Sequence, residues 1–169
     1  HLDIGEIRTL HHAGAGVSHN PSSNLKLASG FAPVVKMLDA GLNVGIGTDG
    51  PASNNDLDMF EEVRLAAFIA KAVTNDPTSL PAPQALLMAT RLGAQALHLG
   101  HLTGSLTPSR RADLILVDLS PVHNSPSFRR SPDNTYAQIV YASKSTDVTD
   151  VMINGKWVMR ERQLLTLKE

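Results

Sequence analysis

The chain has 169 residues, of which 42% are hydrophobic and 18% charged, as in an ordinary globular protein. Its formal net charge of -1 gives no electrostatic reason to bind nucleic acid or an anionic membrane, and the lack of cysteine excludes disulfides and thiolate metal sites. No apolar stretch approaches the roughly 20 residues of a membrane span, and a cytoplasmic enzyme fits these facts.

The N-terminal third of the sequence alternates between helix and strand patterns. Residues 2–12 carry apolar side chains at three-residue spacing, which predicts a short helix. Residues 17–19 indicate a brief strand, followed by a polar loop at 22–24. A second helix is expected over 33–41, and a glycine-rich strand over 42–48. Strand, helix and strand joined by short links are typical of a parallel sheet.

Two further helices are expected before residue 100. The first covers residues 56–72, with Asn54 or Asn55 as its cap. Its buried face is expected to carry four apolar side chains, Leu57, Phe60, Val63 and Ala67. The second begins at Pro83 and continues to about residue 97.

The pattern changes after Gly100 and becomes mostly β. Strands are expected at 112–119, 137–142, 148–153 and 156–159, with a loop rich in proline and serine at 120–134. Asn154-Gly155 is the strongest short signal for a two-residue hairpin. We therefore expect an α/β unit at residues 1–100 and a β region at residues 101–169.

Asp49 is the main candidate for chemistry. It follows directly on the glycine-rich strand, where α/β barrels carry their catalytic side chains. An Asp before Gly-Pro is also a common turn former, so the pattern alone leaves both interpretations open. His19 ends the preceding strand and is either a hydrogen-bonded strut or part of the same site. If the two strands are parallel neighbours, His19 and Asp49 lie at one edge of the sheet.

Two loop motifs carry a specific resemblance. VSHNPSSNLKLASG at residues 17–30 and GTDGPASNN at residues 47–55 closely resemble 5-methylthioadenosine/S-adenosylhomocysteine deaminases. These belong to a branch of the amidohydrolase superfamily that also holds chlorohydrolases and guanine deaminases. The similarity continues through residues 57–66, 104–106, 112–114 and 151–158.

The resemblance implies a fold and a reaction. The chain would be the C-terminal part of a (β/α)8 TIM barrel, its last strands and helices, followed by part of a small β-sandwich. The reaction would be zinc-dependent hydrolytic deamination of an adenine-type nucleoside. Asp49 would end the eighth strand, bind the metal and move a proton from the attacking water to the leaving nitrogen. His19 would end the seventh strand, and Ser53 would lie close to the substrate.

Other residues of the family site have no counterpart here. The resemblance places a His-x-His pair after the first strand, a third His after the fifth, and a catalytic His three residues before the position of His1. We therefore expect the chain to be inactive alone, to bind a small-molecule substrate only within the complete enzyme, and to form a homo-oligomer. Val44 and Ile46 are expected to lose their barrel neighbours. The alternatives are hydrolysis of a triazine or guanine ring, or a non-catalytic assembly module.

Overall fold

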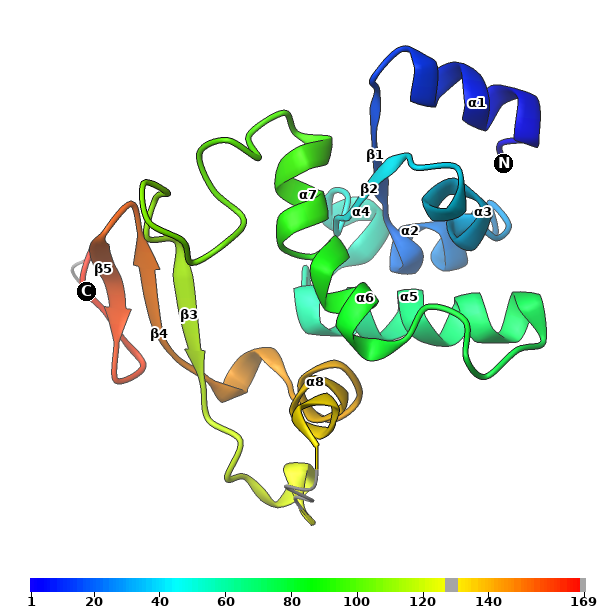
Figure 1. Cartoon of the computed structure of the whole chain (residues 1–169). Coiled ribbons are helices and arrows are strands. Elements are labelled where there is room, and N and C mark those ends of the chain that lie inside the picture. The colour runs from blue at the N-terminus through cyan, green and yellow to red at the C-terminus, as the bar shows by residue number, and fades with distance from the viewer. Residues whose placement is uncertain (127–130, 168–169) are drawn as a thin grey trace.

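The computed structural model describes residues 1–126 and 131–167, which form an α/β part followed by an antiparallel sheet (Figure 1). The α/β part runs through α1 (Ile4–His12), β1 (Gly16–His19), α2 (Pro21–Lys26), α3 (Val34–Asp39), β2 (Asn43–Ile46), α4 (Pro51–Asn54), α5 (Met59–Thr74), α6 (Ala82–Met88) and α7 (Arg91–Ala96). The rest comprises β3 (Leu114–Val117), η1 (Val122–Asn124), α8 (Pro132–Tyr141), η2 (Ser145–Asp147), β4 (Val148–Ile153), β5 (Lys156–Arg160) and β6 (Gln163–Leu164).

The strands β1 and β2 pair in parallel, with His19 opposite Ile46, as the sequence predicts. Helix α7 packs directly on this pair because glycines stand at the contact. A Cβ at Gly45 would lie 2.8 Å from the Cα of Gly93, and one at Gly16 would lie 2.0 Å from the carbonyl oxygen of Ala96. The glycines of the strands therefore set how closely α7 approaches them.

The hydrophobic core surrounds β2. Its members are Ile7, Val34, Met37, Leu42, Val44, Val63, Ala66, Ala67, Ala70, Leu80, Ala82, Ala85, Met88 and Val140. Val44 is fully buried, and α3, α5, α6 and α7 contact β2, so the loss of barrel neighbours does not expose this side chain. Ile46 is only partly buried and lines an apolar groove between α7 and β3.

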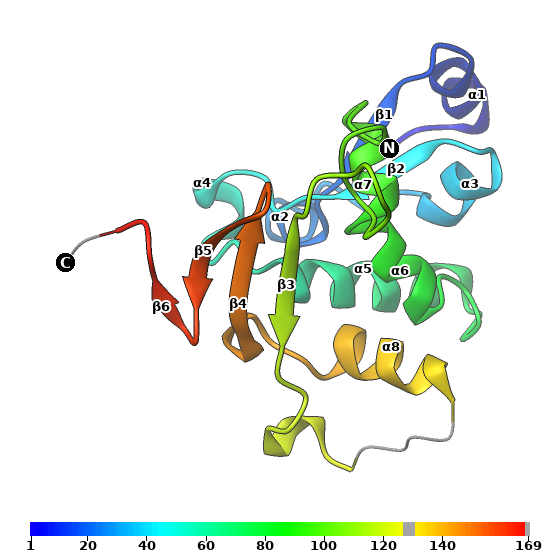
Figure 2. The ribbon, with the colours of Figure 1, turned by 60° about the vertical axis from the view of Figure 1, so that its left-hand side comes forward.

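The strands β3, β4, β5 and β6 form an antiparallel sheet in that order. Asn154 and Gly155 make the tight turn between β4 and β5, with φ angles of 50° and 76°. Both values lie in the left-handed region that a two-residue hairpin of this kind requires, so the predicted hairpin is confirmed. Figure 2 shows this sheet extending away from the parallel pair.

Residues 137–141 of the strand expected at 137–142 instead belong to helix α8, which ends at Tyr141. Val140 is buried, and the ring of Tyr141 stacks on Phe68 of α5 at a centroid distance of 5.4 Å. The short apolar run fits a strand or a helix equally well, and packing on α5 and α6 selects the helix. Residues 127–130 of the loop expected at 120–134 lie outside the described residues.

The start of α5 also differs from the expectation. Asp58, rather than Asn54 or Asn55, caps the helix, and its Oδ1 accepts the backbone N–H of Phe60 at 2.8 Å. Leu57 precedes the helix and is 42% exposed, so it does not belong to the buried face. The polar loop expected at 22–24 lies within α2, and the helix expected from Pro83 to residue 97 is broken between α6 and α7.

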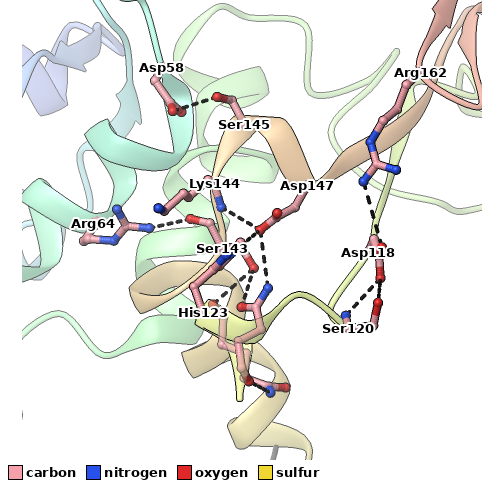
Figure 3. Close-up of polar contacts among 12 residues, drawn as sticks. Asp58, Arg64, Asp118, Ser120, His123, Ser143, Lys144, Ser145, Asp147 and Arg162 are labelled. Carbon is pink, nitrogen blue, oxygen red and sulfur yellow. Dashed lines mark hydrogen bonds and ion pairs between the residues drawn. The ribbon is translucent and has the colours of Figure 1, made fainter. Parts of the chain in front are cut away.

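A buried polar cluster joins α5 to the second part of the chain (Figure 3). Asp147 is 2% exposed, and its Oδ2 lies 2.7 Å from His123 Nε2 and accepts the backbone N–H of Lys144 at 2.9 Å. The Arg64 guanidinium donates to the carbonyl of Ser143. Burial opposes ionisation of Asp147, but the contacts with His123, the backbone N–H of Lys144 and the side chain of Asn124 outweigh it and hold the pKa of this carboxyl below its ordinary value.

Replacing Asp147 with Asn is expected to lower the free energy of unfolding by about 1.5–3 kcal/mol, the contribution of a hydrogen bond to a charged group. Because the pKa of Asp147 is lowered in the fold, its contribution is present above the ordinary value of 3.8 and is lost as pH falls below it. Urea unfolding followed through Trp157, the single tryptophan, measures the difference at pH 7 and pH 3.5. Asp39→Asn, at an exposed position at the end of α3, is the control, and an equal loss in both variants would contradict the prediction.

No helix within residues 1–126 and 131–167 is long and apolar enough to cross a membrane. The same part of the chain exposes several large apolar side chains around the edge strand β3. Leu97 and Leu106 are 71% and 74% exposed, and a groove of about 730 Å³ lies between α7 and β3. Surfaces of this kind favour association between chains.

We therefore expect the chain not to be a stable monomer in isolation. A dimer or larger assembly would cover β3 and the apolar groove beside it. Light scattering on the purified chain at low micromolar concentration measures the mass. A compact species at the monomer mass that unfolds cooperatively would contradict this expectation.

Candidate functional site

The candidate site lies at the carboxyl ends of β1 and β2. His19 is the last residue of β1, and Asp49 follows β2 by three residues. The backbone N–H of Gly47 donates to the carbonyl of His19 at 3.0 Å, which extends the pairing to the end of both strands. The structure therefore brings His19 and Asp49 to the same edge of the sheet, as the sequence predicts.

The Asp49 carboxylate is held by two serine hydroxyls. Ser23 of α2 donates to Oδ2 at 2.7 Å, and Ser53 of α4 donates to the same oxygen at 2.8 Å. Neither hydroxyl bonds Oδ1. Asp49 has a φ of 63°, a left-handed conformation that Asp adopts more readily than most residues and that surrounding contacts must maintain. Its side chain is exposed at the sheet edge.

These contacts keep Asp49 ionised. The hydroxyl of Ser23 makes the largest contribution, followed by the hydroxyl of Ser53 and the backbone N–H of Gly50, and together they lower the pKa of Asp49 below its ordinary value. A carboxylate in this state can bind a cation or accept a proton. Ser23 is 4% exposed and was not expected to take part, because the sequence placed it in a polar loop. Its position within the VSHNPSSN motif is the signal that could have singled it out.

His19 differs from Asp49 in being buried. It is 4% exposed, and neither ring nitrogen has a hydrogen-bond partner within the described part of the chain. Burial lowers the pKa of His19 to about 4, so the ring is neutral at pH 7. It lines a cavity of about 470 Å³ whose other residues are His1, Leu2, Glu6, Val17, Ser18, Asn24, Ala32 and Met37. Asp49 and Ser53 do not line that cavity.

Ser53 contributes to the candidate site by bonding the Asp49 side chain. Its hydroxyl lies 2.8 Å from Asp49 Oδ2 and 3.1 Å from the carbonyl oxygen of Gly50. Both contacts fall within the turn that leads from β2 into α4. Ser53 therefore helps to fix the Asp49 side chain beside the strand edge.

The described residues of this chain do not form a complete metal site. Within residues 1–126 and 131–167, no group of three His, Cys, Asp or Glu residues converges on one point. A catalytic zinc takes at least three protein ligands. Asp49 fits as one of them, because it is an exposed, ionised carboxylate at a strand end.

The chain is similar to known deaminases and hydrolases. It is 51% identical over 167 residues to a 5-methylthioadenosine/S-adenosylhomocysteine deaminase of Moorella thermoacetica, covering 99% of this chain and 38% of that protein. Its fold matches a zinc-bound adenosine deaminase from Xanthomonas campestris with a TM-score of 0.92 and 46% identity, over 99% of this chain and 37% of the other. An atrazine chlorohydrolase from Arthrobacter aurescens, complexed with zinc, matches with a TM-score of 0.86 and 28% identity, over 99% and 36%.

The chain thus spans just over a third of the length of the relatives that it matches. The sequence profile of the amidohydrolase family matches residues 1–158, nearly the whole of the chain. With the specific loop motifs and the parallel strand pair that carries Asp49, this match assigns the chain to the amidohydrolase family.

Proposed function

We propose that the complete protein containing this chain is a zinc-dependent deaminase that removes the amino group from the adenine ring of 5-methylthioadenosine or S-adenosylhomocysteine. The observation that carries the proposal is the ionised Asp49 carboxylate at the strand edge, held by Ser23 and Ser53. The similarity to the Moorella deaminase over 99% of the chain supports the substrate class.

The same proposal covers the architecture of the complete protein. β1 and β2 would be the seventh and eighth strands of a (β/α)8 barrel, in which catalytic side chains stand at the carboxyl ends of the strands. Residues 1–100 would belong to that barrel, and residues 101–169 to a small sandwich whose remaining strands lie elsewhere in the protein. The separation of the strands into two sheets, β1-β2 before residue 100 and β3-β4-β5-β6 after it, supports this division.

Asp49 has two roles in the proposed reaction. It would be one ligand of the metal, and the other ligands would come from the rest of the protein. Zinc, when bound, lowers the pKa of water to about 7 and so provides a nucleophile at neutral pH. Asp49 accepts a proton from the attacking water and returns one to the leaving nitrogen. Water adds to the ring carbon that bears the amino group, ammonia leaves, and the ring keeps an oxygen in its place.

Ser53 and His19 have supporting roles in this proposal. Ser53 holds Asp49 Oδ2, and in this proposal it would lie beside the bound substrate. The neutral ring of His19 has one N–H donor and one acceptor without partners in the described chain, which substrate or another segment of the complete protein can satisfy.

A ring chlorohydrolase is the second candidate, supported by the similarity to the Arthrobacter enzyme. The two candidates predict different products. The complete protein, loaded with zinc, should release ammonia from 5-methylthioadenosine and no chloride from a chlorotriazine. Chloride release without ammonia release would favour the second candidate. Release of neither product would favour the third alternative, a non-catalytic assembly module.

A further inference from the structure

Glu62 of α5 is a buried carboxylate that connects both loops of the candidate site. It is 1% exposed, and its two oxygens have different partners. Oε2 accepts the backbone N–H of Ser22 at 3.1 Å, and Oε1 accepts the side-chain amide of Asn54 at 2.6 Å. Burying a carboxylate is costly unless it is hydrogen-bonded, so the position of Glu62 depends on these two partners.

The bond to Ser22 completes the start of helix α2. Asn20 precedes this helix but makes no side-chain capping bond. The first N–H groups of a helix lack partners within it, and Glu62 supplies one from 40 residues away in the sequence. Glu62 therefore caps α2 from another helix.

The bond to Asn54 fixes the end of α4. Asn54 donates its amide N–H to Glu62, and its Oδ1 accepts the backbone N–H of Leu57 at 2.8 Å. The amide cannot rotate without losing both bonds. Helix α2 contacts both α4 and α5 (Figures 1 and 2), and Glu62 of α5 bonds residues of α2 and α4.

The residues adjacent to these two partners are the ones that hold Asp49. Ser23 follows Ser22 on α2, and Ser53 precedes Asn54 on α4, and both hydroxyls bond Asp49 Oδ2. Two carboxylates thus hold the same pair of short helices at neighbouring residues. Any shift of α2 or α4 on loss of Glu62 would move a hydroxyl away from Asp49.

We propose that Glu62 is a positioning residue for Asp49, acting through α2 and α4. This inference deepens the proposed function and rests on it for the role of Asp49 as metal ligand. Groups that orient a metal ligand commonly change metal affinity or activity by about 10–100-fold when they are replaced. A loss of that size is expected here because Glu62 orients both hydroxyls.

The test uses three variants of the complete protein. Glu62→Gln keeps the shape of the side chain, but one oxygen becomes an NH2 group that faces the N–H of Ser22 or of Asn54. The double variant Glu62→Gln with Asn54→Asp restores the match, because Asp at 54 can accept from the Gln amide and from Leu57. Glu61→Gln, on an exposed neighbouring position, is the control for the loss of one charge.

Three measurements separate positioning from general stability. Glu62→Gln should speed backbone hydrogen exchange in residues 20–26 and 50–57, weaken zinc binding by about 10–100-fold in competition with a chelator, and lower kcat by a similar factor with KM changed less than about three-fold. The double variant should recover most of each loss, and Glu61→Gln should match the wild type. Thermal unfolding verifies that each variant is folded at the assay temperature.

Unchanged exchange or unchanged zinc affinity in Glu62→Gln would overturn the inference, whether or not the protein deaminates the nucleoside. So would a kcat equal to that of an active wild type. A wild-type protein without deaminase activity would instead count against the proposed function, and the Glu62 inference would then be decided by exchange and zinc affinity.

Discussion

Replacing Asp49 with Asn in the complete protein is expected to lower kcat by a factor of at least about 10²–10⁴, the usual contribution of general base catalysis. The substitution keeps the size of the side chain and an oxygen that Ser23 or Ser53 can bond. It removes the negative charge that would bind the metal and accept a proton. Steady-state kinetics with 5-methylthioadenosine, together with zinc analysis of the purified variant, measures both effects.

A matched control makes this result specific. Asp39→Asn changes the same charge at an exposed position at the end of α3, away from the strand edge. It should retain wild-type kcat and zinc content. A near wild-type kcat in Asp49→Asn would refute the role of Asp49 in proton transfer, because the amide of Asn cannot accept a proton as a carboxylate does.

The isolated 169-residue chain is expected to show no deamination and no tight zinc binding. Within the described residues Asp49 and His19 lie at the strand edge, only Asp49 of the two is exposed, and no three potential ligands converge there. A site with one protein ligand cannot match the affinity of one with three or more. Calorimetric titration with zinc, followed by challenge with a chelator, tests the binding, and ammonia release tests the activity.

One result would overturn this second prediction directly. A stoichiometric site that resists the chelator on the purified chain would mean that residues of this chain supply the missing ligands, from a second copy or by rearrangement. The Asp49→Asn form of the same chain identifies whether such a site uses the strand-end carboxylate. Loss of the site in that variant would keep Asp49 as a ligand while correcting the number of its partners.

The sequence alone singled out Asp49, the residue that we propose as a metal ligand. Asp49 follows a glycine-rich strand in a specific motif, and both signals lie within a few residues. The residues that contact Asp49 could not be predicted from local sequence patterns. Ser23 is 26 residues away from Asp49, and Glu62 is 40 residues away from Ser22, so no local spacing connects them. The largest lowering of the pKa of Asp49 comes from one of these long-range contacts, the hydroxyl of Ser23.

Features that depend on neighbouring residues were determined by the sequence itself. Asn154-Gly155 specifies its hairpin because both residues tolerate positive φ, and the alternation of helix and strand patterns indicates the parallel pair of β1 and β2. Tertiary structure decided the features that local pattern leaves ambiguous. Residues 137–141 form part of α8 because Val140 and Tyr141 pack on α5 and α6, and the burial of Asp147 beside His123 required η1 and η2 to meet. Burial and long-range hydrogen bonding select among local conformations of similar energy, which is why only the folded chain reveals them.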